Sequence, residues 1–372
     1  AETATRAGGV SWPSLPGYEI LEELGRGGMG VVYKARQLGL NRIVGLKMLP
    51  AAALPAPEDI ARFRLEAEAI ARLQHPNIVQ VYEIGDHAGA PYFSLTYMEG
   101  GSLHAYLAGK PQPARQAAQV VETLARAMSA VHQCGIVHRD LKPANILLSG
   151  KPVVLTADCL KITDFGLAKR LDSDLRLTQP GMVGGTPSYM SPEQVAADPA
   201  QVGPQTDVYA LGAMLYELLT GRPPFLAATA HDTMEQVVNA EPVSLRRLQP
   251  TLPPDLETIC LKCLQKEPGQ RYASAAALAD DLLRFLEGRP ILARPVSVAE
   301  RAWRWCRRNP LVASLLVSLA TVFVAGFVGV TWSYVEAEGA RQEEARQRRD
   351  ALKARDLANQ TLLTPGLIET NG

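Results

Sequence analysis

Cysteine is scarce in this sequence, and its spacing excludes the common cysteine-based sites. The five cysteines stand at positions 134, 159, 260, 263 and 306. Cys260 and Cys263 form one C-x-x-C pair, but no second such pair and no pair of histidines completes a zinc site. The odd number does not suit a framework of disulfides and is typical of a reducing compartment. We expect Cys260 and Cys263 to be packed thiols on a helix.

An excess of charge of either sign is also absent. Lys and Arg total 38, Asp and Glu total 38, and the formal net charge at pH 7 is zero. Without a basic excess, general binding to nucleic acid is not expected. The 372 residues exceed one average domain, and a content of 47% hydrophobic and 20% charged residues is ordinary for a globular protein.

A long apolar run is missing from most of the chain and occurs once, at residues 311–332. This run carries no charge, and as a helix it would extend roughly 33 Å, enough to cross a bilayer. Trp303, Trp305 and five arginines precede it, as at a cytoplasmic membrane interface. We expect one transmembrane helix, with the N-terminal region on the cytoplasmic side of the cell membrane; a buried globular helix is the alternative. The arginines are Arg294, Arg301, Arg304, Arg307 and Arg308.

The most informative motif lies near the middle of the chain. It reads His138-Arg139-Asp140-Leu141-Lys142-Pro143-Ala144-Asn145, followed by Asp164-Phe165-Gly166. The Asp140 carboxylate can accept the proton of an attacking hydroxyl group, and Lys142 can offset phosphate charge. Asn145 and Asp164 offer the oxygen ligands that hold Mg²⁺ against phosphates. The motif therefore predicts phosphoryl transfer.

A glycine-rich loop occurs far upstream of this motif, between two predicted strands. The G-x-G-x-x-G-x-V pattern and its flanks comprise Leu24, Gly25, Arg26, Gly27, Gly28, Met29, Gly30, Val31 and Val32. Glycine lets the backbone pass close to phosphate groups. The same pattern marks dinucleotide-binding folds, but there a helix opens directly after it. A strand follows here, which favours a loop that covers the phosphates of a nucleotide.

Lys47 closes the next predicted strand, in the sequence Val44-Gly45-Leu46-Lys47. An amphipathic helix is predicted over residues 59–73, because apolar residues recur there at helical spacing. Glu66 on this helix is the expected partner that holds Lys47 on the α- and β-phosphates. The alternative is a surface helix in which Glu66 simply pairs with Arg62 at i, i+4.

Together these motifs resemble the catalytic core of the protein kinase family, and Lys142, two residues after Asp140, resembles the serine/threonine branch. The resemblance implies an α+β fold of two lobes, a β-rich N-lobe and a helical C-lobe. It implies ATP and Mg²⁺ as cofactors and protein Ser and Thr hydroxyls as acceptors. It gives Thr186 a contact with Asp140 and Lys142, makes Asp207 the anchor of the His-Arg-Asp loop, and pairs Glu193 with Arg271.

The resemblance also implies the nucleotide pocket. Adenine would lie between Val32 and Leu147 and against a hinge from Thr96 to Met98. Gly45 stands where the family commonly has alanine, which implies a looser top of this pocket. The nineteen residues from Asn145 to Asp164 exceed the usual spacing, so we expect an extended hairpin around residues 150–152. The apolar column between the lobes would comprise Ile70, Val81, His138 and Phe165.

These observations divide the chain into five parts: a flexible lead-in (1–17), the kinase-like domain (18–289), a basic juxtamembrane segment (290–310), the transmembrane helix (311–332) and a polar helical stalk (333–372), which we take to be truncated. The arrangement is similar to the membrane-anchored, eukaryotic-like (Hanks-type) serine/threonine kinases of bacteria. A membrane-tethered pseudokinase that serves as a scaffold and a kinase of small molecules are the alternatives. All three residues that pseudokinases usually lose, Lys47, Asp140 and Asp164, are present.

The segment from Asp164 to Glu193 predicts regulation. Arg139 places a permanent positive charge beside Asp140, and in kinases with this arrangement a phosphate on the activation loop pairs with the arginine. Thr178 lies eight residues before Thr186, where related bacterial kinases carry a phosphorylated threonine. We predict autophosphorylation of Thr178, between two chains brought together in the membrane; an inert loop threonine is the alternative.

Overall fold

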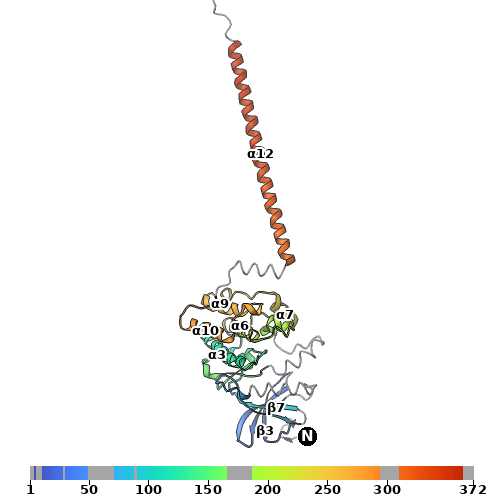
Figure 1. The fold of residues 1–372 in the computed structure, drawn as a ribbon, viewed down its shortest axis with the longest axis vertical. Helices are drawn as coiled ribbons and strands as arrows, with labels where there is room; N and C mark the ends of the chain where they lie inside the picture. Colours follow the sequence, from blue (N-terminus) through green and yellow to red (C-terminus); the bar gives the residue numbers. More distant parts are fainter. Residues whose placement is uncertain are drawn as a thin grey trace, which may run out of the picture. The chain divides into compact units, whose positions relative to one another are not determined.

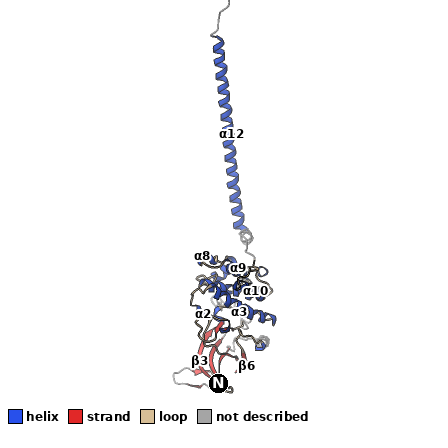
Figure 2. Cartoon of the chain, turned by 90° about the vertical axis from the view of Figure 1, so that its left-hand side faces the viewer, coloured by secondary structure: helices blue, strands red, loops and turns tan. Residues whose placement is uncertain are grey.

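The computed structural model describes residues 4–5, 11–27, 30–48, 71–87, 90–165, 187–293 and 310–362. The chain divides into two compact units, Ala1–Val296 and Ser297–Gly372. In the first unit the strands gather in one lobe and the helices in another (Figure 1). A view from the side shows the same separation of strands and helices (Figure 2). The predicted two-lobed α+β fold is therefore present.

The N-lobe is built on one antiparallel sheet with the strand order β3-β4-β5-β7-β6. Tyr33 and Ala35 on β4 and Val44 and Leu46 on β5 are buried at a spacing of two residues, which puts them on one face of the sheet. They pack with residues of β3 and β7 into a small core separate from that of the C-lobe. The strands are β3 (Tyr18–Gly27), β4 (Gly30–Gln37), β5 (Arg42–Met48), β6 (Val81–His87) and β7 (Ala90–Thr96), with β1 (Ala4–Thr5) and β2 (Ser11–Trp12) as a separate pair.

The C-lobe consists of helices packed around α6 (Pro204–Thr220). This helix is apolar on all sides, and its residues from Thr206 to Leu219 are buried. It begins with Pro204 in its first turn and ends at Gly221, whose φ of 78° is the left-handed conformation that glycine adopts without strain. The other helices are α2 (Leu103–Leu107), α3 (Ala114–Gln133), α5 (Pro192–Val195), α7 (Ala230–Asn239), α8 (Leu245–Leu248), α9 (Pro254–Cys263) and α10 (Ala275–Leu286).

The cysteine pair lies where α9 meets α6. A Cβ atom at Gly212 would stand 2.3 Å from the Cβ of Cys263, so glycine is what allows the two helices to approach. Cys260 and Cys263 are fully buried, and burial raises the pKa of both thiols. The prediction that they are packed thiols on a helix is confirmed.

An extended hairpin supports the junction of the two lobes. Its strands are β8 (Ile146–Leu148) and β9 (Leu160–Ile162), and the long connection between them includes the 3₁₀ turn η3 (Ala157–Cys159). A Cβ atom at Gly100 would lie 1.8 Å from the carbonyl oxygen of Gly150, so the chain that leaves β7 presses directly on this hairpin. The prediction of an extended hairpin is confirmed. The hairpin also packs against the chain at Gly100, which connects the two lobes.

The folded part of the first unit continues past α10. The buried carboxylate of Asp281 accepts hydrogen bonds from the backbone N–H groups of Leu292 (2.5 Å) and Ala293 (2.8 Å) and from the Tyr272 hydroxyl (2.8 Å). Ala293 is part of the C-lobe core. The first residues of the segment that we assigned to 290–310 therefore pack on the C-lobe.

The second unit contains the helix α12 (Pro310–Leu362). It runs without interruption through the predicted boundary between a membrane span and a stalk at residue 332. Large apolar side chains such as Phe323, Phe327 and Trp332 are exposed along it. Among the residues that the structure describes, none of the helices combines the length and the hydrophobicity that a bilayer span needs, so the transmembrane helix predicted for residues 311–332 is not found among them.

Candidate active site

The loop that follows α3 brings three predicted site residues together. The Lys142 ammonium group donates to the Asp140 Oδ2 atom at 2.9 Å. The Asn145 amide nitrogen, in the 3₁₀ turn η2 (Pro143–Asn145), donates to the Asp140 carbonyl oxygen at 2.8 Å and to Oδ2 at 3.1 Å. The Asp140 carboxylate is thus held by a cation and an amide from its own loop, which fixes its direction.

Asp207 of α6 anchors the same loop. One oxygen of the Asp207 carboxylate accepts the backbone N–H of His138 at 2.8 Å, and the other accepts that of Arg139 at 2.9 Å. The His132 ring on α3 also contacts Asp207, at 2.8 Å. Asp207 is fully buried, so these bonds are shielded from water. The anchoring role that the resemblance gave to Asp207 is confirmed.

His138 connects the loop to the strand that leads to Asp164. Its Nε2 atom lies 3.0 Å from the carbonyl oxygen of Thr163, and its Nδ1 atom accepts the Asp140 N–H at 3.3 Å. Burial lowers the pKa of His138 and keeps the ring neutral, with its proton on Nε2. The ring also stacks on Phe165, with centroids 4.7 Å apart. Of the predicted column Ile70, Val81, His138 and Phe165, this confirms the contact of His138 with Phe165, whereas Val81 packs against Phe93.

Two residues of the site have a strained backbone. Arg139 has a φ of 64° and Asp164 a φ of 56°. For residues other than glycine this left-handed conformation costs on the order of 1–3 kcal/mol and persists only where the surroundings hold it. The strain therefore coincides with the catalytic loop and with the predicted metal ligand.

Lys47 and Asp164 meet across the two lobes. The Lys47 ammonium group lies 2.7 Å from the Asp164 Oδ1 atom. The register of the N-lobe sheet places Lys47 opposite Val32, and Val32 opposite Gly25 of the glycine-rich loop. Lys47, which is predicted to contact the phosphates, and the predicted metal ligand Asp164 are thus adjacent. Glu66, the predicted partner of Lys47, lies outside the described residues.

The structure shows contacts of three residues that are predicted to line or adjoin the nucleotide pocket, Leu147, Thr96 and Gly45. Leu147 on β8 faces the chain after β7 through a bridge to Ser102. The Thr96 N–H donates to the Gln80 carbonyl oxygen at 3.0 Å and is therefore engaged within the protein. The contact of the hinge from Thr96 to Met98 with adenine stays a prediction. A Cβ atom at Gly45 would meet Leu95 at 3.9–4.0 Å, ordinary van der Waals contact, so alanine would fit there.

Asn145 and Asp164 fit a magnesium site. The Asn145 amide nitrogen donates to Asp140, so the amide oxygen of Asn145 would be the atom that binds a cation. Asp164 contributes a carboxylate, which has several lone pairs besides the one that Lys47 uses. Within the described ranges, no group of three or more His, Cys, Asp or Glu side chains could hold a metal ion. Mg²⁺ commonly binds through one or two carboxylates together with waters and phosphate oxygens, and Asp164 and Asn145 would be its protein ligands here.

Several predicted site residues lie outside the described ranges: Gly28, Met29, Glu66, Thr178 and Thr186. Their roles stay predictions. Ile70, a member of the predicted apolar column, also lies outside. The predicted pair Glu193–Arg271 is present, with two bonds of 2.7 Å between guanidinium and carboxylate.

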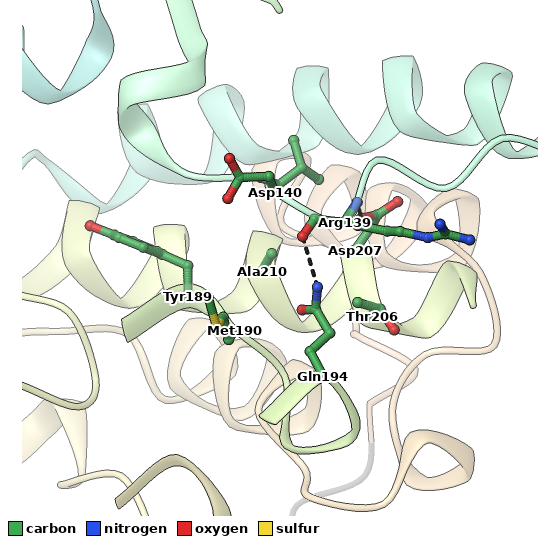
Figure 3. A pocket seen from close by; sticks show the side chains of 9 residues that line it. Arg139, Asp140, Tyr189, Met190, Gln194, Thr206, Asp207 and Ala210 are labelled. Carbon is green, nitrogen blue, oxygen red and sulfur yellow. Dashed lines mark hydrogen bonds between the residues drawn. The ribbon is translucent and has the colours of Figure 1, made fainter. Parts of the chain in front are cut away.

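Gln194 is a residue of this region that the sequence did not reveal. Its amide nitrogen donates to the Arg139 carbonyl oxygen at 2.7 Å (Figure 3). In the sequence Gln194 is one polar residue in a short helical stretch after Pro192 and Glu193, and its type and spacing point to no partner. Only the fold brings it to the catalytic loop.

Known proteins resemble this chain over the region just described. The sequence profile of the protein kinase domain matches residues 18–283. Serine/threonine-protein kinase PknB of Mycobacterium leprae is 38% identical over 278 residues, which cover 73% of this chain and 43% of that protein. Serine/threonine-protein kinase pkn3 of Myxococcus xanthus is 38% identical over 272 residues, 71% and 49% of the two chains.

A solved structure supports the fold. The kinase domain of Mycobacterium tuberculosis PknI, in a mutant form, has a TM-score of 0.56 and 28% sequence identity, and the match covers 76% of this chain and 99% of that one. The chain belongs to the protein kinase family, and residues 18–283 are a protein kinase domain of the serine/threonine type. Membership implies the use of ATP and a divalent metal ion. The chain spans less than half the length of the curated relatives named above.

Proposed function

We propose that this chain transfers the γ-phosphoryl group of ATP to Ser and Thr hydroxyl groups of protein substrates, with Mg²⁺ as the divalent ion. The observation that supports this proposal most strongly is the arrangement of Asp140, Lys142 and Asn145 on one loop. Lys47 and Asp164 are bonded to each other across the lobes. These are the groups that phosphoryl transfer requires, because it depends on positioning and on charge rather than on a covalent intermediate.

Each of these residues has a defined task in the proposed reaction. The Asp140 carboxylate orients the acceptor hydroxyl and takes its proton, while the hydroxyl oxygen bonds to the γ-phosphorus. The bond from that phosphorus to the β–γ bridging oxygen breaks, and ADP leaves. Lys142 and Lys47 offset the phosphate charge. Asn145 and Asp164 would hold the metal ion, which neutralises charge on the phosphate oxygens when bound.

A scaffold without catalysis is the alternative function, and the geometry does not favour it. Such proteins usually lack the lysine, the catalytic aspartate or the metal-binding aspartate. Here Lys47 and Asp164 bond at 2.7 Å, and the Asp140 carboxylate is held by two neighbours. Arg139 and Asp164 also have the strained backbone that is common at active sites.

The test of the proposed cofactor is a metal titration. The full chain is incubated with ATP labelled at the γ-phosphate and a generic basic protein, over a range of Mg²⁺ concentrations. We expect no transfer in the presence of a chelator and transfer that rises and saturates with Mg²⁺. Transfer at the same rate in the chelator would contradict the assignment of Asn145 and Asp164 as metal ligands.

We further propose that residues 311–332 anchor the kinase at the cell membrane, with the kinase domain on the cytoplasmic side. The support is the sequence of the run itself, which lacks charge, and the tryptophans and arginines before it. Large side chains within it, such as Phe323 at 76% exposure, are exposed along α12. Anchoring would also bring two chains together and favour phosphorylation of one by the other, which is how we propose that Thr178 is modified.

The membrane proposal is tested by fractionation of cells that express the full chain. We expect it to sediment with membranes, to resist alkaline carbonate and to dissolve in detergent. A variant in which Leu319, Phe323 and Phe327 are changed to Lys should move to the soluble fraction, because a charge in a bilayer costs roughly 2.5–3.5 kcal/mol. The proposal fails if the unchanged chain is recovered in the soluble fraction without detergent.

A further inference from the structure

Gln194 joins two parts of the active site that are distant in sequence. It lies in α5, directly after Glu193, and its side chain reaches the carbonyl oxygen of Arg139 with a bond of 2.7 Å. Its amide oxygen accepts the Ser191 N–H at 3.1 Å and the Ser191 hydroxyl at 3.3 Å. Both ends of one amide are therefore engaged, one with the catalytic loop and the other with the start of α5.

The bond to Arg139 acts on the peptide plane that leads into Asp140. A peptide unit is rigid, so the Arg139 carbonyl and the Asp140 N–H turn together. Gln194 holds the carbonyl end of this plane, and the His138 Nδ1 atom holds the N–H end at 3.3 Å. Any rotation of the plane turns the backbone of Asp140 and with it the direction of the carboxylate.

The Arg139–Asp140 peptide plane must be held by contacts, because the backbone of Arg139 is strained. Arg139 has a φ of 64°, and a residue other than glycine leaves that conformation unless contacts hold it. The Asp207 carboxylate holds the Arg139 N–H at 2.9 Å. Gln194 holds the carbonyl oxygen of the same residue through the bond drawn in Figure 3. A cavity of ≈ 10 Å³ lies among these residues, lined also by Tyr189, Met190 and Ala210, and it has room for about one water at most.

We propose that Gln194 is a positioning residue for phosphoryl transfer: its amide clamps the Arg139–Asp140 peptide and so aims the Asp140 carboxylate at the acceptor hydroxyl. The inference rests on the proposed function. Of the polar side chains, an amide is required here, because one end must donate to a carbonyl oxygen and the other must accept from Ser191. Through the bonds of Gln194 to Ser191 and to Arg139, the start of α5 is tied to the catalytic loop.

The test compares two near-isosteric variants of the full chain. Gln194→Glu keeps the oxygen that accepts from Ser191 but sets a carboxylate oxygen against the Arg139 carbonyl oxygen. Gln194→Met removes both donor and acceptor. At pH 8 we expect kcat to fall at least tenfold in both variants, which is about 1.4 kcal/mol. The KM for ATP should stay within twofold, because the nucleotide contacts Lys47 and the glycine-rich loop.

The pH dependence separates positioning from a merely structural role. When the carboxyl group that Gln194→Glu introduces is protonated, its hydroxyl can donate to the Arg139 carbonyl oxygen again. The kcat deficit of Gln194→Glu relative to wild type should therefore narrow as pH falls toward the pKa of the introduced carboxyl group, which the facing Arg139 carbonyl oxygen raises above the ordinary glutamate value of about 4.3. The deficit of Gln194→Met should not change with pH. Gln112→Glu, which loses a similar side-chain bond to a backbone carbonyl at 2.9 Å far from this loop, serves as the control with unchanged kcat.

Three results would overturn the proposal: a kcat within twofold of wild type in Gln194→Glu at pH 8, a deficit that is the same at every pH, or a deficit explained entirely by the fraction of unfolded protein in circular dichroism. Absence of kinase activity in the wild-type chain would instead overturn the proposed function. The two failures are therefore distinguishable.

Discussion

Replacing Asp164 by Asn is expected to lower kcat by about a thousandfold or more, which corresponds to about 4 kcal/mol of transition-state stabilisation. The substitution keeps the size of the side chain and leaves an oxygen that can still accept from Lys47, which lies 2.7 Å away in the wild type. It removes the negative charge that would hold the metal ion on the phosphates. The measurement is single-turnover transfer of labelled phosphate to a generic basic protein at saturating Mg²⁺.

The matched control is Asp158→Asn in the hairpin of β8 and β9, which directly precedes Asp164. Asp158 is exposed, in the 3₁₀ turn η3, and the same change there should leave kcat within twofold. A second readout is the affinity for ATP with and without Mg²⁺, by calorimetry. We expect Mg²⁺ to strengthen ATP binding to the wild type and to have little effect on Asp164→Asn. Equal activity of Asp164→Asn and wild type would show that the metal site is elsewhere.

The second large effect is on stability, at the buried ion pair of Arg271 and Glu193. All five N–H donors of Arg271 are matched, two by the Glu193 carboxylate at 2.7 Å and three by backbone carbonyl oxygens. Both side chains are at most 2% exposed. Arg271→Met should lower the free energy of unfolding by about 3–5 kcal/mol, because it leaves a buried carboxylate without its cation.

The expected fall in melting temperature is on the order of 10 °C, measured by calorimetry or by circular dichroism. Arg247→Met is the control, because Arg247 is exposed on α8 and such a change is usually worth less than about 0.5 kcal/mol. If Arg271→Met melted within 2 °C or so of wild type, the ion pair would not be a main tie between α5 and the rest of the C-lobe.

This stability should depend on pH in a defined direction. Burial acts to raise the pKa of Glu193, but the hydrogen bonds and charge of Arg271 outweigh burial and bring the pKa below its ordinary value of 4.5. Since the pKa is lower in the folded state, the contribution is complete above the unfolded value and disappears as pH falls through the folded value. The difference in stability between wild type and Arg271→Met should be largest at and above neutral pH. It should shrink as pH falls, because without Arg271 burial raises the pKa of Glu193 in the variant and the carboxyl group there is protonated first, and it should be smallest below about pH 4.

The sequence was a good guide wherever chemistry requires a residue type at a fixed spacing. Asp140, Lys142 and Asn145 lie within six residues of one another, so their meeting on one loop follows from local geometry. Asp207, Glu193 and Arg271 were assigned through the family resemblance, and the structure confirms their contacts. The two-lobed fold was implied by the same resemblance, and among the described residues strands β3 to β7 precede residue 98 and the C-lobe helices follow it.

What the sequence could not show are contacts set by tertiary packing between residues of ordinary type. Gln194 reaches Arg139 only because α5 folds under the catalytic loop, and no periodicity encodes that bond. Asp281 binds the backbone of Leu292 and Ala293, which any sequence could provide. The close approach at Gly100 and Gly212 is likewise a property of the packed chain, because a glycine in a sequence does not reveal its neighbour.

The most direct test of the central claim is the chemical identity of the phosphorylated product. The full chain and its Asp140→Asn variant, in which only the Asp140 charge is lost, are incubated with γ-labelled ATP, Mg²⁺ and a generic basic protein, and the labelled amino acids are separated after hydrolysis. We predict phosphoserine and phosphothreonine with the wild type and, with Asp140→Asn, a signal lower by about three orders of magnitude. Equal labelling by the two proteins, or no labelled serine or threonine with the wild type, would contradict the assignment of this chain as an Asp140-dependent serine/threonine kinase.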